Sequence, residues 1–313
     1  MSNKQLYKTI CEQHPEIPVF SQYWWMDATC PEWDAAIVTK GNHTKGVWAY
    51  PTEHKAGVSL IRNPQLTPYM GPKVFFPKDI KESNIDSYEY ETITELLKQI
   101  QDAQVWNLSV QPNLKQAGLF KQYGLQQSVQ QTFLLDLAAD EATLRSNMKE
   151  TLRKNIRQAE AEMTITNSPE HVAELYEFYK QMLARKGKSA HFTLAYMQRL
   201  VDACVAHDAG ALWVAKSEGK ILGIVWQVWD AECSYALSLG QNPESENYKA
   251  MSLLLWHGIK EAKRRGQKTF DLEGSMDPGV ERFYRNFGGA RALYLVLSKN
   301  TSRIWKLKQM LRG

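Results

Sequence analysis

The sequence predicts an α/β fold with a mixed sheet, made of two tandem units that repeat one order of elements. Three observations predict this fold. Each half opens with short alternating apolar segments that are typical of a β meander. Each half then continues as helix, strand, short helix and strand. Apolar and glycine positions of the two halves also fall in step, namely Leu108 with Leu272, Phe120 with Phe283 and Gly124 with Gly288.

The first unit is predicted to span residues 1–138 and to be the non-catalytic one. Its meander comprises the segments WDAAIVTK, VWAYPTEH and GVSLIRNP. The segments that follow it in chain order are a helix at 90–103, a strand at 104–112, a short helix at 114–124 and a strand at 127–138.

The second unit is predicted to span residues 139–313 and to open with a linking helix over 141–162. Leu144, Met148, Leu152 and Ile156 recur in that segment at four-residue spacing, which gives one apolar stripe. Two further helices are expected at 171–187 and 193–207. The meander that follows has its turns at Glu218-Gly219 and at 230–232.

The last helix of the repeat, near 251–265, has an apolar face and ends in basic residues followed by Gly266. No acidic residue precedes Glu261 in it, so its first backbone amides could hold an anion. A short strand, QKTFDLEG, comes next. A second short helix then ends at Gly288 and Gly289.

Composition narrows the classes of function. A formal net charge of +4 permits an anionic partner without requiring one. No apolar stretch of about 18 residues is present, and the N-terminus lacks the apolar core of a signal peptide. The four cysteines are widely spread, with no zinc-like spacing. We therefore expect a cytoplasmic protein without a metal, a nucleotide P-loop, a dinucleotide site or DNA binding.

The order helix, strand, short helix, with FYRNFGG at its end, resembles the second half of a GNAT-type acyltransferase. Two such units joined by a charged helix resemble the FemAB-like group of tandem GNAT proteins. The runs TFLLDL, LRSNMKETLRKNIRQAE and YEFYKQMLARKG also carry this resemblance. It implies an N-acyltransferase that moves an acetyl or other acyl group from coenzyme A to an amine. The implied acceptor is an amino sugar or amino acid, small or lipid-linked, in cell-envelope or polysaccharide biosynthesis.

The resemblance implies that Tyr284 protonates the leaving thiolate. Along QKTFDLEG, the alternation of a strand places Thr269, Asp271 and Glu273 on one face. Asp271 and Glu273 are candidates to deprotonate the amine or to hold a cationic acceptor, with Glu273 preferred. Two structural alternatives stay open: Tyr284 could pack on the sheet, and the carboxylates could pair with a basic neighbour or orient the next loop. The first half has Lys121 at the position of Tyr284.

In the family, the strand end before this helix and the helix start hold the acyl-CoA, and backbone amides of the segment 238–240 bind the oxyanion. The usual loop motif, Q/R-x-x-G-x-G/A, is replaced here by NPESENYKAM. Trp226 and Trp229 lie on opposite faces of their strand, so one could line the acceptor site while the other is core. The implied cofactor-binding residues are Leu239, Gly240, Asn247, Tyr248, Lys249, Ala250 and Met251.

Other functions remain open. A basic row at Arg145, Lys149, Arg153 and Arg157 could meet tRNA, which would suit an aminoacyl-tRNA-dependent transferase. Acidic residues at i, i+4 spacing favour a salt-bridged, solvated face instead. The basic tail 299–313 could touch a membrane peripherally or simply cap its domain. A non-catalytic binding module on the same fold is the third alternative.

Overall fold

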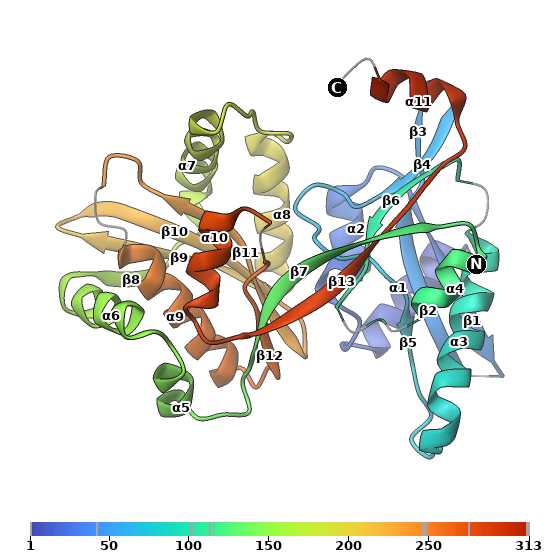
Figure 1. Cartoon of the computed structure of the whole chain (residues 1–313), viewed down its shortest axis with the longest axis horizontal. Helices are drawn as coiled ribbons and strands as arrows, with labels where there is room; N and C mark the ends of the chain where they lie inside the picture. Colours follow the sequence, from blue (N-terminus) through green and yellow to red (C-terminus); the bar gives the residue numbers. More distant parts are fainter. Residues whose placement is uncertain are drawn as a thin grey trace. The chain divides into compact units, whose positions relative to one another are not determined.

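The computed structural model describes residues 2–41, 43–100, 103–112, 114, 116–245, 249–274 and 276–310. The chain divides into two compact units, which are coloured by sequence in Figure 1. Unit 1 comprises Met1–Gln130 and Leu293–Gly313, and unit 2 comprises Gln131–Ala292. The predicted units, 1–138 and 139–313, follow the repeat of elements. They differ from the compact units in residues 131–138 and 293–313.

An exchange of strands explains this difference. Strand β13 (Ala290–Asn300) pairs antiparallel with β6 (Val105–Ser109) of unit 1. Strand β7 (Gln126–Asp136) pairs antiparallel with β12 (Thr269–Asp271) of unit 2. In a simple repeat each of these strands would pair within its own half of the sequence. Each half instead supplies a strand to the sheet of the other unit.

Unit 1 has a three-stranded sheet, in the order β1-β2-β5, and a second group of paired strands in the order β3-β4-β6-β13. Its core gathers buried aromatic side chains such as Trp48, Trp106 and Phe120. Its other elements are α1 (Asn3–Gln13), η1 (Val19–Ser21), α2 (Tyr23–Thr29), β1 (Trp33–Lys40), β2 (His43–Pro51), β3 (Glu53–Lys55), β4 (Val58–Arg62), β5 (Lys73–Val74), α3 (Glu82–Gln99), α4 (Ala117–Gln122) and α11 (Arg303–Met310).

Unit 2 arranges its strands in the order β7-β12-β11-β10-β9-β8. The turn between β9 and β10 is confirmed at Glu218 and Gly219, both with positive φ (48° and 76°), as a tight hairpin requires. Its remaining elements are α5 (Glu141–Ser146), α6 (Glu150–Glu162), β8 (Thr164–Asn167), η2 (Pro169–His171), α7 (Val172–Arg185), α8 (Leu194–Ala206), β9 (Gly210–Ser217), β10 (Lys220–Trp229), β11 (Cys233–Gln241), α9 (Lys249–Arg264) and α10 (Pro278–Arg285).

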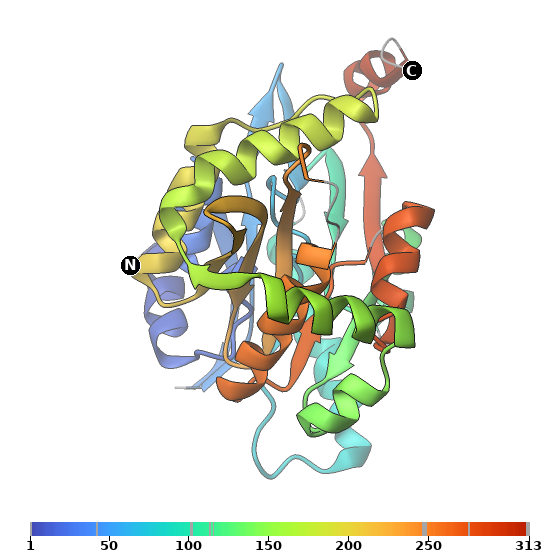
Figure 2. The ribbon, with the colours of Figure 1, turned by 90° about the vertical axis from the view of Figure 1, so that its left-hand side faces the viewer.

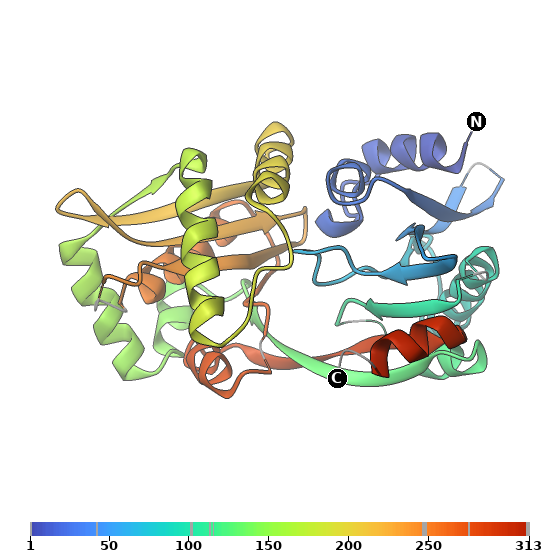
Figure 3. The same cartoon turned by 90° about the horizontal axis from the view of Figure 1, so that it is seen from above.

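Helices α7 and α9 cover opposite faces of this sheet. Gly240 lies against Leu175 and Phe178 of α7, and its partner on β10 is Ile224. Gly223, the neighbour of Ile224, lies against the first turn of α9. Adjacent residues of a strand point to opposite faces, so the two helices sandwich the sheet. Figure 2 shows α6 lying across α9, and Figure 3 shows α7 crossing the strands of this sheet. Helix α7 contacts β11 and β10, and α8 contacts β9.

The single helix predicted at 141–162 is wrong at residues 147–149, where α5 ends and α6 begins. The Lys149 amide donates to the Asn286 carbonyl at 3.0 Å, just after α10. Asn147 lies so close to Gly288 that a Cβ there would approach the Asn147 carbonyl oxygen to 2.5 Å. Met148 is buried between these contacts. The tertiary contact therefore interrupts a helix that the apolar spacing alone would continue.

Candidate active site

The candidate site of unit 2 lies where two parallel strands separate. Strands β11 and β12 pair only from Cys233 with Thr269 to Tyr235 with Asp271. Beyond this, β11 continues to Gln241 along β10, while the Leu272 amide donates to the Phe133 carbonyl in β7 at 3.0 Å. The segment after Asp271 is therefore held by β7.

The predicted shared face of Thr269, Asp271 and Glu273 is corrected here, because the strand ends at Asp271. Glu273 takes the left-handed conformation, with φ of 50°, which is uncommon for a residue other than glycine. Its backbone amide donates to Asp271 Oδ1 at 2.7 Å. The two carboxyl groups thus come together through a turn rather than through the alternation of a strand.

Asp271 is buried and held by hydrogen bonds. Besides the Glu273 amide, the Thr132 hydroxyl donates to Asp271 Oδ1. The same hydroxyl oxygen accepts from the Gly274 amide at 2.8 Å. Thr132 lies in β7, in the half of the sequence predicted to be non-catalytic. Thr132 begins the run TFLLDL, but nothing in the sequence gave it a role at the site, and the strand exchange brings it here.

Glu273 is half-buried as a residue, but its carboxyl group points inward. The Oε1 atom is buried and makes no hydrogen bond to any of the described residues. Burial, and secondarily the charge of Asp271, raise the pKa of Glu273 well above its ordinary value of 4.5. A carboxyl group that points inward and has a raised pKa is a candidate to exchange protons with a substrate.

Tyr284 lies on α10, whose first turn is capped by Asp277. Asp277 Oδ1 accepts from the Gly279 amide at 2.9 Å, and Lys186 forms an ion pair with Asp277 at 2.6 Å. Tyr284 is buried, and burial raises its pKa, with Glu273 and Asp271 adding to the effect. Tyr284 also packs within the hydrophobic core of unit 2. The structure therefore brings all three predicted catalytic residues into one cluster.

The predicted donor-binding residues flank the loop between β11 and α9. Leu239 and Gly240 lie at the end of β11, and Lys249, Ala250 and Met251 form the first turn of α9, which contains no acidic residue. Asn247 and Tyr248 lie outside the described residues. The described part of the loop is ordered by Asn242, whose side chain accepts from the Glu244 amide and donates to the Ile221 carbonyl.

The two predicted substrate-binding tryptophans are both buried. Trp226 has no exposed surface. Trp229 donates from its ring nitrogen to the Asp208 carbonyl at 2.7 Å, and Arg265 stacks on its ring at 4.0 Å. Both indoles thus belong to the interior of unit 2, and contact with an acceptor stays a prediction.

Parts of the basic row on α5 and α6 are engaged within the unit. Arg145 pairs with Glu160 at 2.9 Å, and Arg153 donates to the Ser146 carbonyl. Intramolecular pairing favours the salt-bridged reading of this face. In unit 1, Trp305 of α11 packs on Val58, Leu60 and Val105, which agrees with a capping helix.

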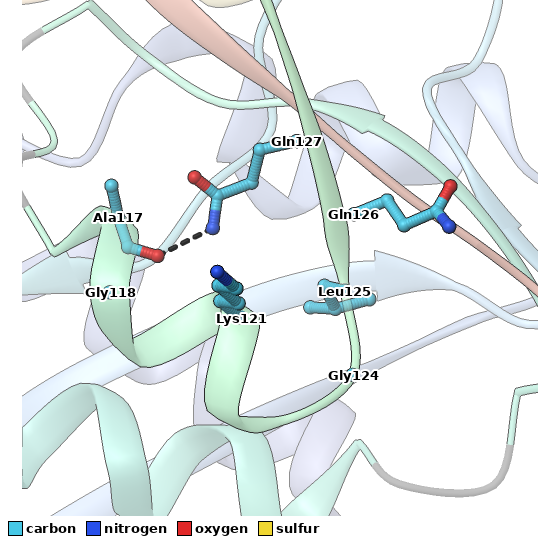
Figure 4. A pocket seen from close by; sticks show the side chains of 7 residues that line it. All are labelled: Ala117, Gly118, Lys121, Gly124, Leu125, Gln126 and Gln127. Carbon is cyan, nitrogen blue, oxygen red and sulfur yellow. Dashed lines mark hydrogen bonds between the residues drawn. The ribbon is translucent and has the colours of Figure 1, made fainter.

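Unit 1 offers a different environment at the equivalent of Tyr284. A hollow of about 730 Å³ lies beside Lys121 on α4, and Figure 4 shows Lys121 and Gln127 turned toward each other. Gln127 donates to the Ala117 carbonyl at 2.5 Å. The residues that line this hollow are Ala117, Gly118, Lys121, Gly124, Leu125, Gln126 and Gln127, and none of them carries a carboxyl group.

The described part of the chain contains no group of three or more His, Cys, Asp and Glu residues placed to hold a metal ion. None of its helices is long and apolar enough to span a membrane.

Comparison with known families agrees with this geometry. Residues 144–285 match the family model described as acetyltransferase (GNAT) domain. This segment is a GNAT domain. It contains β11, α9, β12 and α10, and with them Asp271, Glu273 and Tyr284. No curated protein sequence gives a significant match to the chain.

Solved structures share the fold over nearly the whole chain. A crystal structure of FemX superposes with a TM-score of 0.67 at 14% identity, over 93% of this chain and 95% of that one. The C-terminal domain of a putative lysylphosphatidylglycerol synthetase from Agrobacterium fabrum gives 0.60 at 12% identity, over 98% and 95%. A tandem GNAT protein from the clavulanic acid biosynthesis pathway gives 0.51 at 12%, over 89% and 86%. The predicted mixed α/β fold of GNAT type is confirmed. The predicted FemAB-like group is consistent with these neighbours and stays a prediction.

Proposed function

We propose that this protein is an N-acyltransferase that moves an acetyl or related acyl group from coenzyme A to an amine. The observation that carries the proposal is the buried group of Asp271, Glu273 and Tyr284 inside the GNAT domain. The acceptor we propose is an amino sugar or amino acid, free or lipid-linked, of a cell-envelope or polysaccharide precursor.

Each step of the transfer has a group that can perform it. Glu273, once ionised, takes a proton from the ammonium group of the acceptor. The free amine forms a C–N bond with the thioester carbonyl, and collapse of the tetrahedral intermediate breaks the C–S bond. The thiolate then takes the phenol proton of Tyr284. The tyrosinate takes the second proton that the acylated nitrogen loses, which leaves a neutral amide, and Glu273 releases its proton to solvent.

The electrostatics of the cluster suit this order. A charged Glu273 raises the pKa of Tyr284, so the phenol keeps its proton before the reaction. When Glu273 takes the proton of the amine, it becomes neutral and this effect disappears. Tyr284 therefore becomes a better acid at the point where the thiolate leaves. We assign the oxyanion donors to the backbone amides of residues 238–240, by analogy with the family.

For the donor, we propose that the first amides of α9 hold a phosphate group of coenzyme A. The absence of acidic residues in the first turn of α9 supports this assignment, since the positive end of the helix dipole is left uncompensated.

Isothermal calorimetry with acetyl-CoA tests the donor. We expect micromolar binding by the intact protein and weaker binding by Lys249→Glu, which places a negative charge in the first turn of α9. Lys154→Glu on α6 changes the net charge equally and should bind like the unchanged protein. If Lys249→Glu and Lys154→Glu bind acetyl-CoA equally well, α9 does not hold the donor.

A second candidate function keeps the fold and changes the donor to an aminoacyl-tRNA. It is favoured by the name of one fold neighbour, since lysylphosphatidylglycerol is a lipid that carries an aminoacyl group. Binding of charged tRNA that collapses steeply with salt, together with no binding of acetyl-CoA, would favour it. A protein that binds neither donor and transfers no acyl group would be the non-catalytic binding module.

A further inference from the structure

We propose that Thr132, on strand β7, is a positioning residue that holds the catalytic carboxyl group of Glu273 in place. This inference deepens the proposed function and rests on it for the role of Glu273. Thr132 comes from the other half of the sequence, 139 residues before Asp271. The candidate site is therefore built from both halves of the chain.

The Thr132 hydroxyl is used in both directions. Its proton goes to Asp271 Oδ1, and its oxygen accepts from the Gly274 amide at 2.8 Å. A hydroxyl group is the side-chain function of this size that donates and accepts at once. Thr132 has no exposed surface, so water does not compete for either bond. The hydroxyl thus ties together the two residues that flank Leu272 and Glu273.

The backbone of this turn is anchored on β7 on both sides of Glu273. Before it, the Leu272 amide donates to Phe133 at 3.0 Å. After it, Gly274 packs so closely on β7 that a Cβ there would overlap the backbone of Thr132 and Gln131. Between these anchors Glu273 is held with φ of 50°. A non-glycine residue keeps this conformation only when its surroundings impose it.

The Glu273 side chain depends on this backbone hold. Its Oε1 atom has no hydrogen-bond partner among the described residues, so no bond at that atom restrains the carboxyl group. The direction in which the carboxyl group points is then set by the turn, and the turn is closed by Thr132. Asp271, held by the same hydroxyl, lies beside Glu273.

The test compares full-length Thr132→Val, which keeps the shape and removes the hydroxyl, with Thr132→Ser, which keeps the hydroxyl. Thr92→Val is the matched control, because Thr92 is equally buried in unit 1 and donates to the Tyr88 carbonyl. The first readout is the titration of Glu273 followed by ¹³C NMR of its carboxyl carbon, assigned with Glu273→Gln. The second is the split of transfer kinetics into kcat and KM.

We expect the pKa of Glu273 to fall toward 4.5 in Thr132→Val, because a loosened turn exposes the carboxyl group to water. Thr132→Ser and Thr92→Val should titrate like the unchanged protein. In Thr132→Val, kcat should fall about 10- to 100-fold with little change in KM for the acyl donor. If Thr132→Val does not fold, Thr132→Ala removes the same hydroxyl with a smaller side chain. The same Glu273 titration then tests the inference.

Two outcomes would overturn the inference: an unchanged Glu273 titration in the variant without the hydroxyl, or a loss in Thr132→Ser as large as in Thr132→Val. The NMR titration uses no substrate, so it separates this inference from the proposed function. A shifted titration in a protein that transfers no acyl group would uphold the positioning role and reject the function. Normal acyl transfer by Thr132→Val would reject the positioning role and leave the proposed function standing.

Discussion

Each unit contains a pair of parallel strands that separate at one end. The chain beyond that end follows a different course in each unit. In unit 1, β4 and β6 pair from Leu60 with Val105 to Arg62 with Asn107. The Asn63 side chain then bridges to Ser109, accepting from its amide at 2.6 Å and donating to its carbonyl at 3.4 Å. The Met70 amide also donates to the Ser109 carbonyl at 2.8 Å. The chain after β4 therefore stays attached to β6.

In unit 2 the chain after β12 turns to β7 instead and carries Glu273 inward. By the repeat that aligns Leu108 with Leu272, unit 1 has Asn107 and Ser109 where unit 2 has Asp271 and Glu273. Where the parallel strands separate, unit 1 has side-chain amide hydrogen bonds, whereas unit 2 has a pair of carboxyl groups. This difference supports assigning the chemistry to unit 2.

The largest expected effect is on Glu273. Glu273→Gln should lower the rate of acyl transfer by about 10²- to 10⁴-fold, because the amide cannot accept the proton of the ammonium group. The pKa of Glu273 is raised above 4.5, so the ionised base accumulates only as the pH rises through that higher value. The rate of the unchanged protein should rise over this range, while Glu273→Gln stays flat in a pH profile. Ser109→Ala in unit 1 is the control and should transfer the acyl group at the normal rate. An equal loss of rate in Ser109→Ala and Glu273→Gln would contradict the assignment of the chemistry to unit 2.

A smaller loss is expected for the proton donor. Tyr284→Phe should reduce transfer about tenfold or more, since water must then protonate the thiolate. Lys121→Met changes the equivalent residue of unit 1 and should leave the rate unaltered. The rate of acyl transfer is measured by steady-state kinetics on both variants, and melting curves verify that they fold. A rate in Tyr284→Phe equal to that of the unchanged protein would show that its role is packing.

The smallest effect should be on stability alone. Asn63→Ala removes both hydrogen bonds to Ser109 and should cost about 1–3 kcal/mol in the free energy of unfolding, measured with urea. Asn63→Asp keeps the acceptor and should lose less. Acyl transfer should stay normal in both variants. A drop in transfer without a loss of stability would instead place unit 1 within the catalytic machinery.

Local patterns in the sequence predicted the elements well. The strand 33–40 and the hairpin turn at Glu218 and Gly219 lie where apolar alternation and turn residues indicated them. Asp271, Glu273 and Tyr284 were also named together from the sequence, because all three lie within one segment of about 15 residues that resembles the family. Their catalytic roles stay a prediction. Such features depend on neighbours in sequence, which a single chain displays directly.

Long-range contacts escaped prediction. The helix 141–162 has an uninterrupted apolar stripe, yet the contacts of Asn147 and Lys149 with residues after α10 divide it. The left-handed conformation of Glu273 and the role of Thr132 likewise depend on β7, which is remote in sequence. No local pattern encodes which distant backbone a segment will meet.

The sequence by itself determined the order and type of the elements, because apolar periodicity and turn chemistry act over a few residues. Only the tertiary structure decided which strand pairs with which. Both β7 and β13 could have completed the sheet of their own half, and their exchange follows from register and packing across the whole chain. That exchange brings Thr132 to the turn that holds Glu273, so the candidate site is a product of the fold.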